Sequence, residues 1–287
     1  MRQILLSIGI TWGLALPLWG QKNTAPYELV PDDDSIYVEK FASSNTDENR
    51  FTANNSIYVA NRQWTYDYYY ENQTGQKFWF EPVPTRVGAD AWRWVSVDSV
   101  SNTTVRQVRL TVTAGLGPFV TMPGYDQTII QYDYLSAVGM SPFNEQTGVV
   151  ENEKNVWMHP PRSQFFRVLE LNPFPYIQAP FQIGNRWRWR LTIGDPWQDV
   201  RWKTWSGTIL NTYEYEIISI QTIETPVGSF SCYEIRAVAT NRLGKTQLTA
   251  YFSKQAGFVR LEYVNIDGSK TVLMLNSMDP TVVSGKP

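Results

Sequence analysis

The sequence predicts a mostly β protein built from large, curved antiparallel sheets, shaped as a half-barrel or a clam, with little helix. The chain has 12 Trp, 16 Tyr and 13 Phe among 287 residues, and aromatic side chains favour pleated, half-buried surfaces. Short runs of alternating apolar and polar residues recur between turn-forming residues, which is typical of strands. Helical periodicity is scarce along the whole chain. Together these observations predict an all-β architecture.

Residues 1–20 have the order of a secretory signal peptide. Met1–Gln3 carries one positive charge, Ile4–Leu18 is mostly apolar, and Gly20 offers a small residue for cleavage before Gln21, with Ala15 as the competing position. The apolar run is short for a bilayer span, which needs about 20 residues. No cysteine lies near either cleavage position. We therefore expect an exported, soluble mature chain, periplasmic or extracellular, with no lipid anchor and no transmembrane segment.

The net charge and the cysteine content bear on nucleic-acid binding and on disulfide formation. The formal net charge is −2 at pH 7, whereas a nucleic-acid-binding domain would carry a basic patch or stripe. Cys232 is the only cysteine, so the chain can form no intramolecular disulfide and must be stabilised by packing. We expect no nucleic-acid partner.

The N-terminal β region, residues 21–136, contains six predicted strands. Residues 105–113 show the pattern most clearly, because Val108, Leu110 and Val112 alternate with Gln107 and Arg109. Such alternation indicates a strand with one buried face. The strands are predicted at 56–60, 64–70, 77–83, 91–100, 105–113 and 128–135.

Residues 137–179 form a proline-rich connecting segment. Proline lacks a backbone donor and interrupts regular structure, and the segment has prolines at 142, 160, 161, 173 and 175. Only Ser163–Leu171 has a pattern that would suit a short helix or an edge strand. We expect an irregular linker between two halves, or a long loop lying over a sheet.

Residues 180–287 predict an antiparallel β meander with short connections. Asp267-Gly268 is the strongest hairpin signal in the chain, because glycine tolerates the positive φ that tight turns require. The flanking strands place Leu261 on a buried face, opposite Leu273 and Leu275. This region forms either a second domain or one continuous domain with residues 21–136.

Three motifs in this order resemble the TapB-like family of exported bacterial β-proteins, a family of unknown function. They are the Pro180–Trp187 opening, the turn and strand at Thr225–Phe230, and the hairpin from Tyr251 through Gly257 to Arg260. The resemblance covers roughly residues 180–277. It implies a curved antiparallel sheet akin to the half-barrels of LolA-type lipoprotein carriers, and it implies no catalytic residue.

Catalytic and metal-binding motifs are scarce. His159 is the only histidine, so a histidine-based triad or an imidazole-ligated zinc site would have to use it. Its setting between Trp157 and Pro160 is more typical of a loop histidine. Asp195 and Asp199 could serve as a glycosidase pair, but Gly-Asp-Pro is also an ordinary turn. We therefore expect a non-catalytic protein without a cofactor or a metal.

One block of aromatic and basic residues stands out as a candidate ligand site. It combines tryptophans, which could stack on a sugar ring or hold an acyl chain, with arginines, which could bind a carboxylate or a phosphate. The alternative is that the tryptophans fill the core while the arginines face water, and the alternation from Arg186 to Arg190 fits that alternative. The candidate residues are Trp187, Trp189, Trp197, Trp202, Trp205, Arg188 and Asp195.

These observations support three hypotheses about function. The first is an exported, non-catalytic β-protein that binds an apolar or amphipathic ligand, such as a lipid, on a concave sheet. The second is a carbohydrate-binding or glycan-processing protein, which requires several tryptophans exposed in a row. The third is a structural partner in envelope assembly, which an exposed, unpaired edge strand would favour.

Overall fold

The computed structural model describes residues 26–32, 35–83, 91–122 and 124–279, so the predicted signal peptide lies outside the described residues. In the described residues the chain is mostly β, as the sequence predicts. The strands are β1 (Tyr27–Asp32), β2 (Ile36–Phe41), β3 (Gln63–Glu71), β4 (Lys77–Pro82), β5 (Trp92–Ser96), β6 (Gln107–Val112), β7 (Thr128–Ser136), β8 (Gly139–Glu151), β9 (Asn155–Met158), β10 (Tyr176–Gln178), β11 (Arg186–Gly194), β12 (Thr208–Thr225), β13 (Gly228–Asn241), β14 (Gly244–Ser253), β15 (Gly257–Val264) and β16 (Lys270–Met278). Within the described residues, the strands are accompanied by the short 3₁₀ helices η2 (Gly117–Phe119), η3 (Gln164–Leu171) and η4 (Asp195–Trp197).

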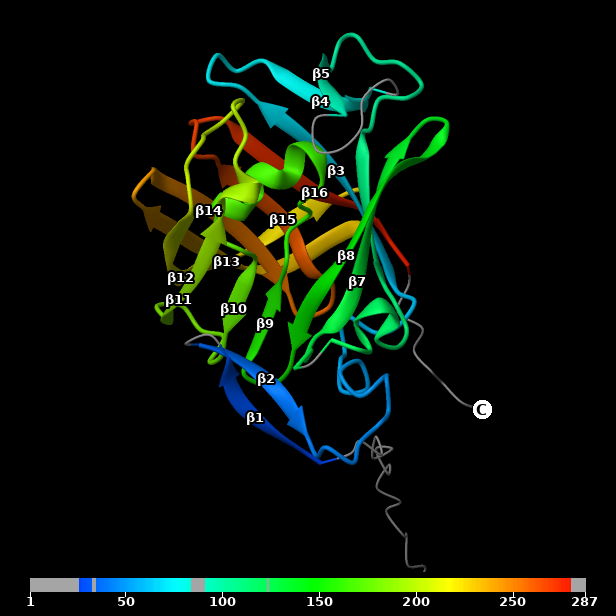
Figure 1. The fold of residues 1–287 in the computed structure, drawn as a ribbon, viewed down its shortest axis with the longest axis vertical. Helices are drawn as coiled ribbons and strands as arrows, with labels where there is room; N and C mark the ends of the chain where they lie inside the picture. Colours follow the sequence, from blue (N-terminus) through cyan, green and yellow to red (C-terminus); the bar gives the residue numbers. More distant parts are fainter. Residues whose placement is uncertain (1–25, 33–34, 84–90, 123, 280–287) are drawn as a thin grey trace, which may run out of the picture.

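Fourteen of the strands form one antiparallel sheet that curls into a nearly closed barrel (Figure 1). The main path runs β10-β9-β8-β7-β6-β3-β16-β15-β14-β13-β12-β11. The pairing of β3 with β16 joins the N-terminal strands to the C-terminal meander. The sheet is therefore continuous from β10 to β11.

The two ends of the sheet, β10 and β11, approach each other through side chains. The rings of Tyr176 and Trp187 lie 5.6 Å apart, and Asn185 Nδ2 donates to the carbonyl of Gln178 at 2.8 Å. The separate β1–β2 hairpin lies across this seam, at the bottom of Figure 1. There Tyr176 Oη donates to the carbonyl of Ser35 at 2.7 Å, and Ser35 Oγ donates to the carbonyl of Arg188 at 2.5 Å. The hairpin thus connects the two ends of the sheet.

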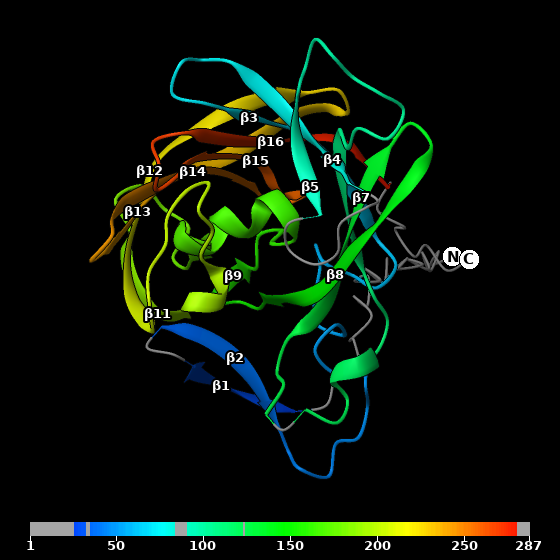
Figure 2. The same ribbon diagram turned by 45° about the horizontal axis from the view of Figure 1, so that its top comes forward.

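The interior of the barrel is filled by side chains. Figure 2 shows the green coil of η3 inside the ring of strands. Phe165 and Phe166 are almost fully buried, and the ring of Phe166 lies 4.9 Å from that of Tyr68 and 5.6 Å from that of Tyr134. The concave face of the sheet is therefore packed against η3.

The proline-rich segment is more regular than the sequence predicts, because it contains β8, β9 and β10 in addition to η3, which lies where a short helix was one of the predictions. Pro142 lies where the register of β7 and β8 shifts, between the pairs Leu135–Met140 and Asp133–Asn144. A proline is tolerated at such a bulge because no ladder hydrogen bond is required there. The remaining prolines fall between elements, so they limit strand length without abolishing the strands.

The C-terminal hairpin has the predicted form. β15 pairs with β16, Leu261 lies opposite Leu273, and both are buried. Gly268 adopts φ +81° at the turn, where its N–H donates to the carbonyl of Asn265 at 2.9 Å. The predicted face of this hairpin is confirmed.

Candidate functional site

The aromatic and basic block predicted from the sequence lies mainly in the core. Trp187 and Trp189 of β11 point inward, where their rings stack on Tyr215 at 5.3 Å and on Tyr213 at 4.8 Å. Trp202 and Trp205 are also buried. These four indoles are therefore shielded from solvent, which fits the alternative that the tryptophans fill the core.

The other members of the block are engaged locally. Trp197 is half-buried beneath two guanidinium groups, those of Arg162 at 5.4 Å and Arg167 at 5.3 Å from its ring centroid. Arg188 is exposed and pairs with Glu214 at 2.7 Å. Asp195 accepts a hydrogen bond at 2.8 Å from the backbone N–H of Gly207, which lies twelve residues further along the chain.

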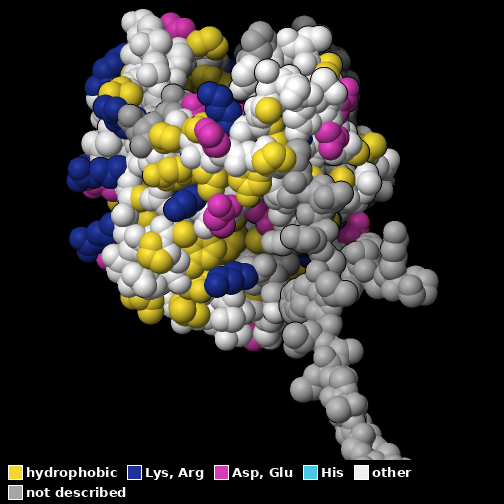
Figure 3. Space-filling model, turned by 90° about the horizontal axis from the view of Figure 1, so that it is seen from below, with side chains coloured by type: hydrophobic (Ala, Val, Ile, Leu, Met, Phe, Trp, Pro, Cys, Tyr) yellow, Lys and Arg dark blue, Asp and Glu magenta, His cyan; other side chains and the backbone are white. Residues whose placement is uncertain are grey.

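The outer face of β11–β13 is covered by such ion pairs. Arg186 pairs with Glu216 across β11 and β12 at 2.9 Å, and Arg236 pairs with Glu234 on β13 at 3.3 Å. Figure 3 shows Lys and Arg side chains gathered along its left edge, the side on which β11–β13 lie in Figure 1. This surface is charged, and Arg186, Arg188 and Arg236 each have a carboxylate partner.

Two residues considered for catalysis have structural partners. The ring of His159 packs between Trp157 at 4.7 Å and Phe174 at 5.0 Å, and burial lowers the pKa of the imidazole well below its usual value. The carboxylate of Asp199 accepts two hydrogen bonds from Arg201, one from the side-chain Nε and one from the backbone N–H. Burial would raise the pKa of Asp199, but these bonds outweigh burial and lower it. Both side chains are therefore engaged by neighbouring residues of the fold.

An open groove lies elsewhere in the fold, along β3. The first half of β3 pairs with β6, and its end pairs with β4. β3 pairs with β6 over Gln63–Asp67, but with β4 only at Tyr70 and Glu71. The two partner strands diverge between these points and meet again at the bridge Phe80–Val105. The sheet therefore forks along the second half of β3.

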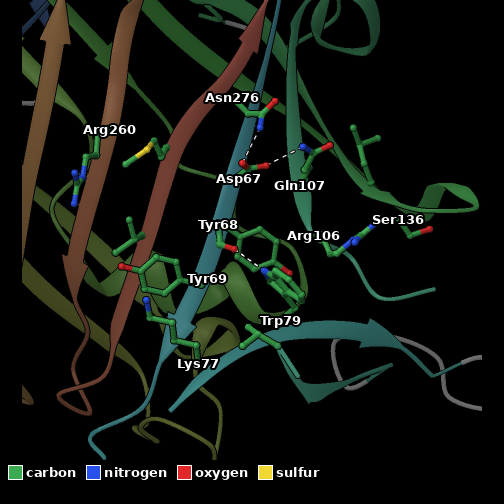
Figure 4. Close-up of a pocket in the computed structure, with 14 residues that line it drawn as sticks. Asp67, Tyr68, Tyr69, Lys77, Trp79, Arg106, Gln107, Ser136, Arg260 and Asn276 are labelled. Carbon is green, nitrogen blue, oxygen red and sulfur yellow. Dashed lines mark hydrogen bonds between the residues drawn. The ribbon is translucent and has the colours of Figure 1, made fainter. Parts of the chain in front are cut away.

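The groove at this fork has a volume of about 710 Å³ and lies on the outer face of the sheet. That volume falls within the usual range of small-molecule sites. Its apolar lining comes from Tyr69 on β3, Trp79 on β4, and Val272 and Met274 on β16. Figure 4 shows the labelled residues arranged around β3 and the neighbouring strands. We call this feature the fork groove.

Hydrogen bonds fix the aromatic side chains at the fork. The indole Nε1 of Trp79 donates to the carbonyl of Tyr68 at 2.7 Å, which satisfies a backbone acceptor where β4 and β3 separate (Figure 4). Tyr68 Oη donates to the carbonyl of Val105 at 2.7 Å and accepts from the backbone N–H of Phe80 at 3.2 Å. The walls of the fork groove are therefore held in place before a ligand arrives.

Glu81 anchors the β4–β5 hairpin beside the groove. Its carboxylate accepts hydrogen bonds from Arg93 on β5, from Thr103 at 2.6 Å and from Ser101. Burial would raise the pKa of Glu81, but the bonds from Ser101, Thr103 and Arg93 outweigh burial and lower it to about 2. A charged, fully engaged Glu81 thus ties β4 and β5 to the loop that precedes β6.

Asp67 supplies the carboxylate of the fork groove. Gln107 Nε2 on β6 donates to one of its oxygens at 2.8 Å, and Asn276 Nδ2 on β16 donates to the other at 2.7 Å (Figure 4). These bonds link β3 to the strand on each side of it, β6 and β16. Asp67 therefore holds the side chains of Gln107 and Asn276 in place beside the groove.

Three cationic side chains line the same groove: Lys77 on β4, Arg106 before β6 and Arg260 on β15. Lys77 Nζ lies 4.1 Å from the ring centroid of Tyr69. Arg260 forms an ion pair with Glu262. The groove thus combines an apolar floor with cations at its rim, an arrangement that suits an amphipathic ligand.

No local pattern in the sequence predicts the fork groove. The strands that form it were predicted, but the divergence of β4 from β3 has no local sequence signal. A weak indication was the run Tyr68-Tyr69-Tyr70, which places aromatic rings on both faces of one strand. Aromatic residues on the solvent face of a strand could have indicated a surface site.

Within the described residues, no group of three or more His, Cys, Asp or Glu is placed to hold a metal ion. In the same part of the chain, no helix is long and apolar enough to cross a membrane.

No known family model matches the sequence, and no curated protein matches it. The resemblance to the TapB-like family over residues 180–277 stays a prediction. Among solved structures, the chain is similar to a predicted lipoprotein from Parabacteroides distasonis, with 14% identity and a TM-score of 0.43 over 78% of this chain and 97% of that one. It is also similar to a predicted exported protein with a YmcC-like fold from Bacteroides fragilis, with 12% identity and a TM-score of 0.39 over 78% and 98%. The hypothetical lipoprotein YmcC from Escherichia coli gives 8% identity and a TM-score of 0.33 over 83% and 91%.

Proposed function

We propose that this chain is an exported, non-catalytic β-protein that binds an apolar or amphipathic small molecule in the fork groove. Export rests on the predicted signal peptide. Binding rests on one structural observation, the preformed groove of about 710 Å³ with an aromatic and aliphatic floor. Sites for small molecules are typically concave, largely apolar and preformed.

The location differs from the concave sheet that the sequence predicts. That face is packed against η3, whose Phe165, Phe166 and Leu169 are buried. A close-packed interior has no room for a ligand unless side chains are displaced. The outer groove needs no such displacement.

The glycan-binding alternative depended on tryptophans exposed in a row. Trp187, Trp189, Trp202 and Trp205 are buried, and Trp197 is half-buried beneath two arginines. The described residues of this block therefore do not form a row of exposed tryptophans, which is the feature that would favour a glycan ligand.

Titration with a fluorescent long-chain fatty acid tests the proposal. We expect saturable binding to the wild-type protein and a loss of about tenfold in affinity for Met274→Gln, because a polar amide replaces an apolar contact on the groove floor. Leu210→Gln is the matched control, because Leu210 is exposed on β12 outside the groove. An absence of saturable binding, or equal losses in both variants, would contradict the proposal.

A further inference from the structure

The cations at and around the fork groove differ in whether they have a carboxylate partner. Around it, Arg93 pairs with Glu81, Lys270 pairs with Glu71 and Arg260 pairs with Glu262. Lys77 and Arg106 line the groove itself. Neither forms an ion pair with a carboxylate of the described residues.

Lys77 is held over the groove floor. It is exposed at the start of β4, yet its ammonium lies 4.1 Å from the ring centroid of Tyr69. Figure 4 shows the end of its side chain beside Tyr69, on the same side of β3 as Arg260. An exposed lysine side chain can extend into water. Here the contact between the ammonium and the face of the Tyr69 ring stabilises the position of Lys77 above the groove. The ammonium is therefore placed where a bound molecule would meet it.

The carboxylate of Asp67 offsets only part of the positive charge in the groove. Each of its two oxygens already accepts a hydrogen bond, from Gln107 and from Asn276, and both donors are neutral amides. The lining therefore has three cations, Lys77, Arg106 and Arg260, against this one carboxylate. Even with Arg260 assigned to Glu262, the groove keeps an excess of positive charge.

We propose that the ligand of the fork groove is an anion, a carboxylate or a phosphate monoester, with its charged group against Lys77 and its apolar body along Tyr69, Val272 and Met274. This inference rests on the proposed function and specifies the chemistry of its ligand. A charged acceptor strengthens the hydrogen bonds that an ammonium donates, and the apolar floor accommodates the uncharged part of the molecule. Arg106 lies toward Ser136 at the other end of the groove (Figure 4), where it adds to the attraction without contacting the same group.

Three matched fluorescent probes test this inference: a long-chain acid, its methyl ester and a phosphate monoester of the same chain length. We expect the wild-type protein to bind the acid or the phosphate about tenfold more tightly than the ester. Whichever of the two anions binds more tightly shows whether the groove prefers a carboxylate or a phosphate. In Lys77→Gln the preference for the anion should fall to near unity, while the ester binds as before.

Lys245→Gln is the control, because Lys245 is exposed on β14 and does not line the groove. Both variants are checked for a wild-type thermal unfolding midpoint, since each changes an exposed side chain. Equal binding of acid, phosphate and ester by the wild-type protein would overturn the anion inference and leave the proposed function standing. A preference for the anion that persists in Lys77→Gln would overturn the role of Lys77. Failure of all three probes to bind would overturn the proposed function itself.

Discussion

The placement of η3 inside the barrel makes a specific prediction for Phe166→Ala. Phe166 is fully buried, and its ring lies within 6.1 Å of the rings of Tyr68, Phe80, Tyr134 and Phe165. The substitution removes the ring and leaves a cavity that four aromatic neighbours, each fixed on its own element, cannot collapse to fill. Because η3 contacts the sheet through this ring, the substitution should lower the free energy of unfolding of the whole barrel.

The expected cost is about 3–5 kcal/mol, the range for truncating a buried phenylalanine to alanine. For a chain of this size, each kcal/mol lowers the thermal midpoint by about 2–4 °C, so the midpoint should fall by roughly 6–20 °C. Phe119→Ala is the control, because Phe119 is only half-buried and its ring stacks on Tyr125 alone, at 4.7 Å. Its cost should stay below about 2 kcal/mol.

Chemical denaturation followed by circular dichroism measures both variants. If Phe166→Ala unfolds within about 1 kcal/mol of the wild-type protein, η3 is not an integral part of the core. The interior would then be available to a ligand, and the packed core would no longer favour the outer groove as the binding site.

Two further predictions concern the sheet and the hairpin across its seam. Leu261→Ala should cost about 2–5 kcal/mol because Leu261 is buried against Leu273, and Gly268→Val should also destabilise because the turn has φ +81°; wild-type denaturation midpoints would refute the assigned face. Burial raises the pKa of Glu39 on β2 to about 7, so the folded protein binds this proton more tightly than the unfolded chain and loses stability as pH rises from about 4.5 toward 7. Glu39→Gln cannot titrate and should flatten that part of the stability profile, whereas an unchanged slope would show that Glu39 is already ionised.

Local patterns along the chain predicted most of the strands. The alternation in residues 105–113 indicated one buried face, and Val108, Leu110 and Val112 are fully buried. The turn signal Asp267-Gly268 predicted the tip of the last hairpin. Such features are readable because side-chain direction and turn geometry depend on neighbouring residues.

The long-range pairings were not predictable in the same way. The fork depends on β3 exchanging β6 for β4, and the packed interior depends on η3 entering a barrel whose strands come from both halves of the chain. Neither leaves a periodic signal. The tryptophans of the aromatic and basic block illustrate the same limit, because an aromatic ring on an alternating strand suits both a core and a ligand platform.

A crystal structure of the protein with a long-chain fatty acid bound tests the central claim most directly. The account predicts electron density for the chain in the fork groove, along Tyr69 and Met274, with the carboxylate against Lys77 and η3 in its present position. Density inside the barrel, with η3 displaced from Phe80 and Tyr134, would contradict it.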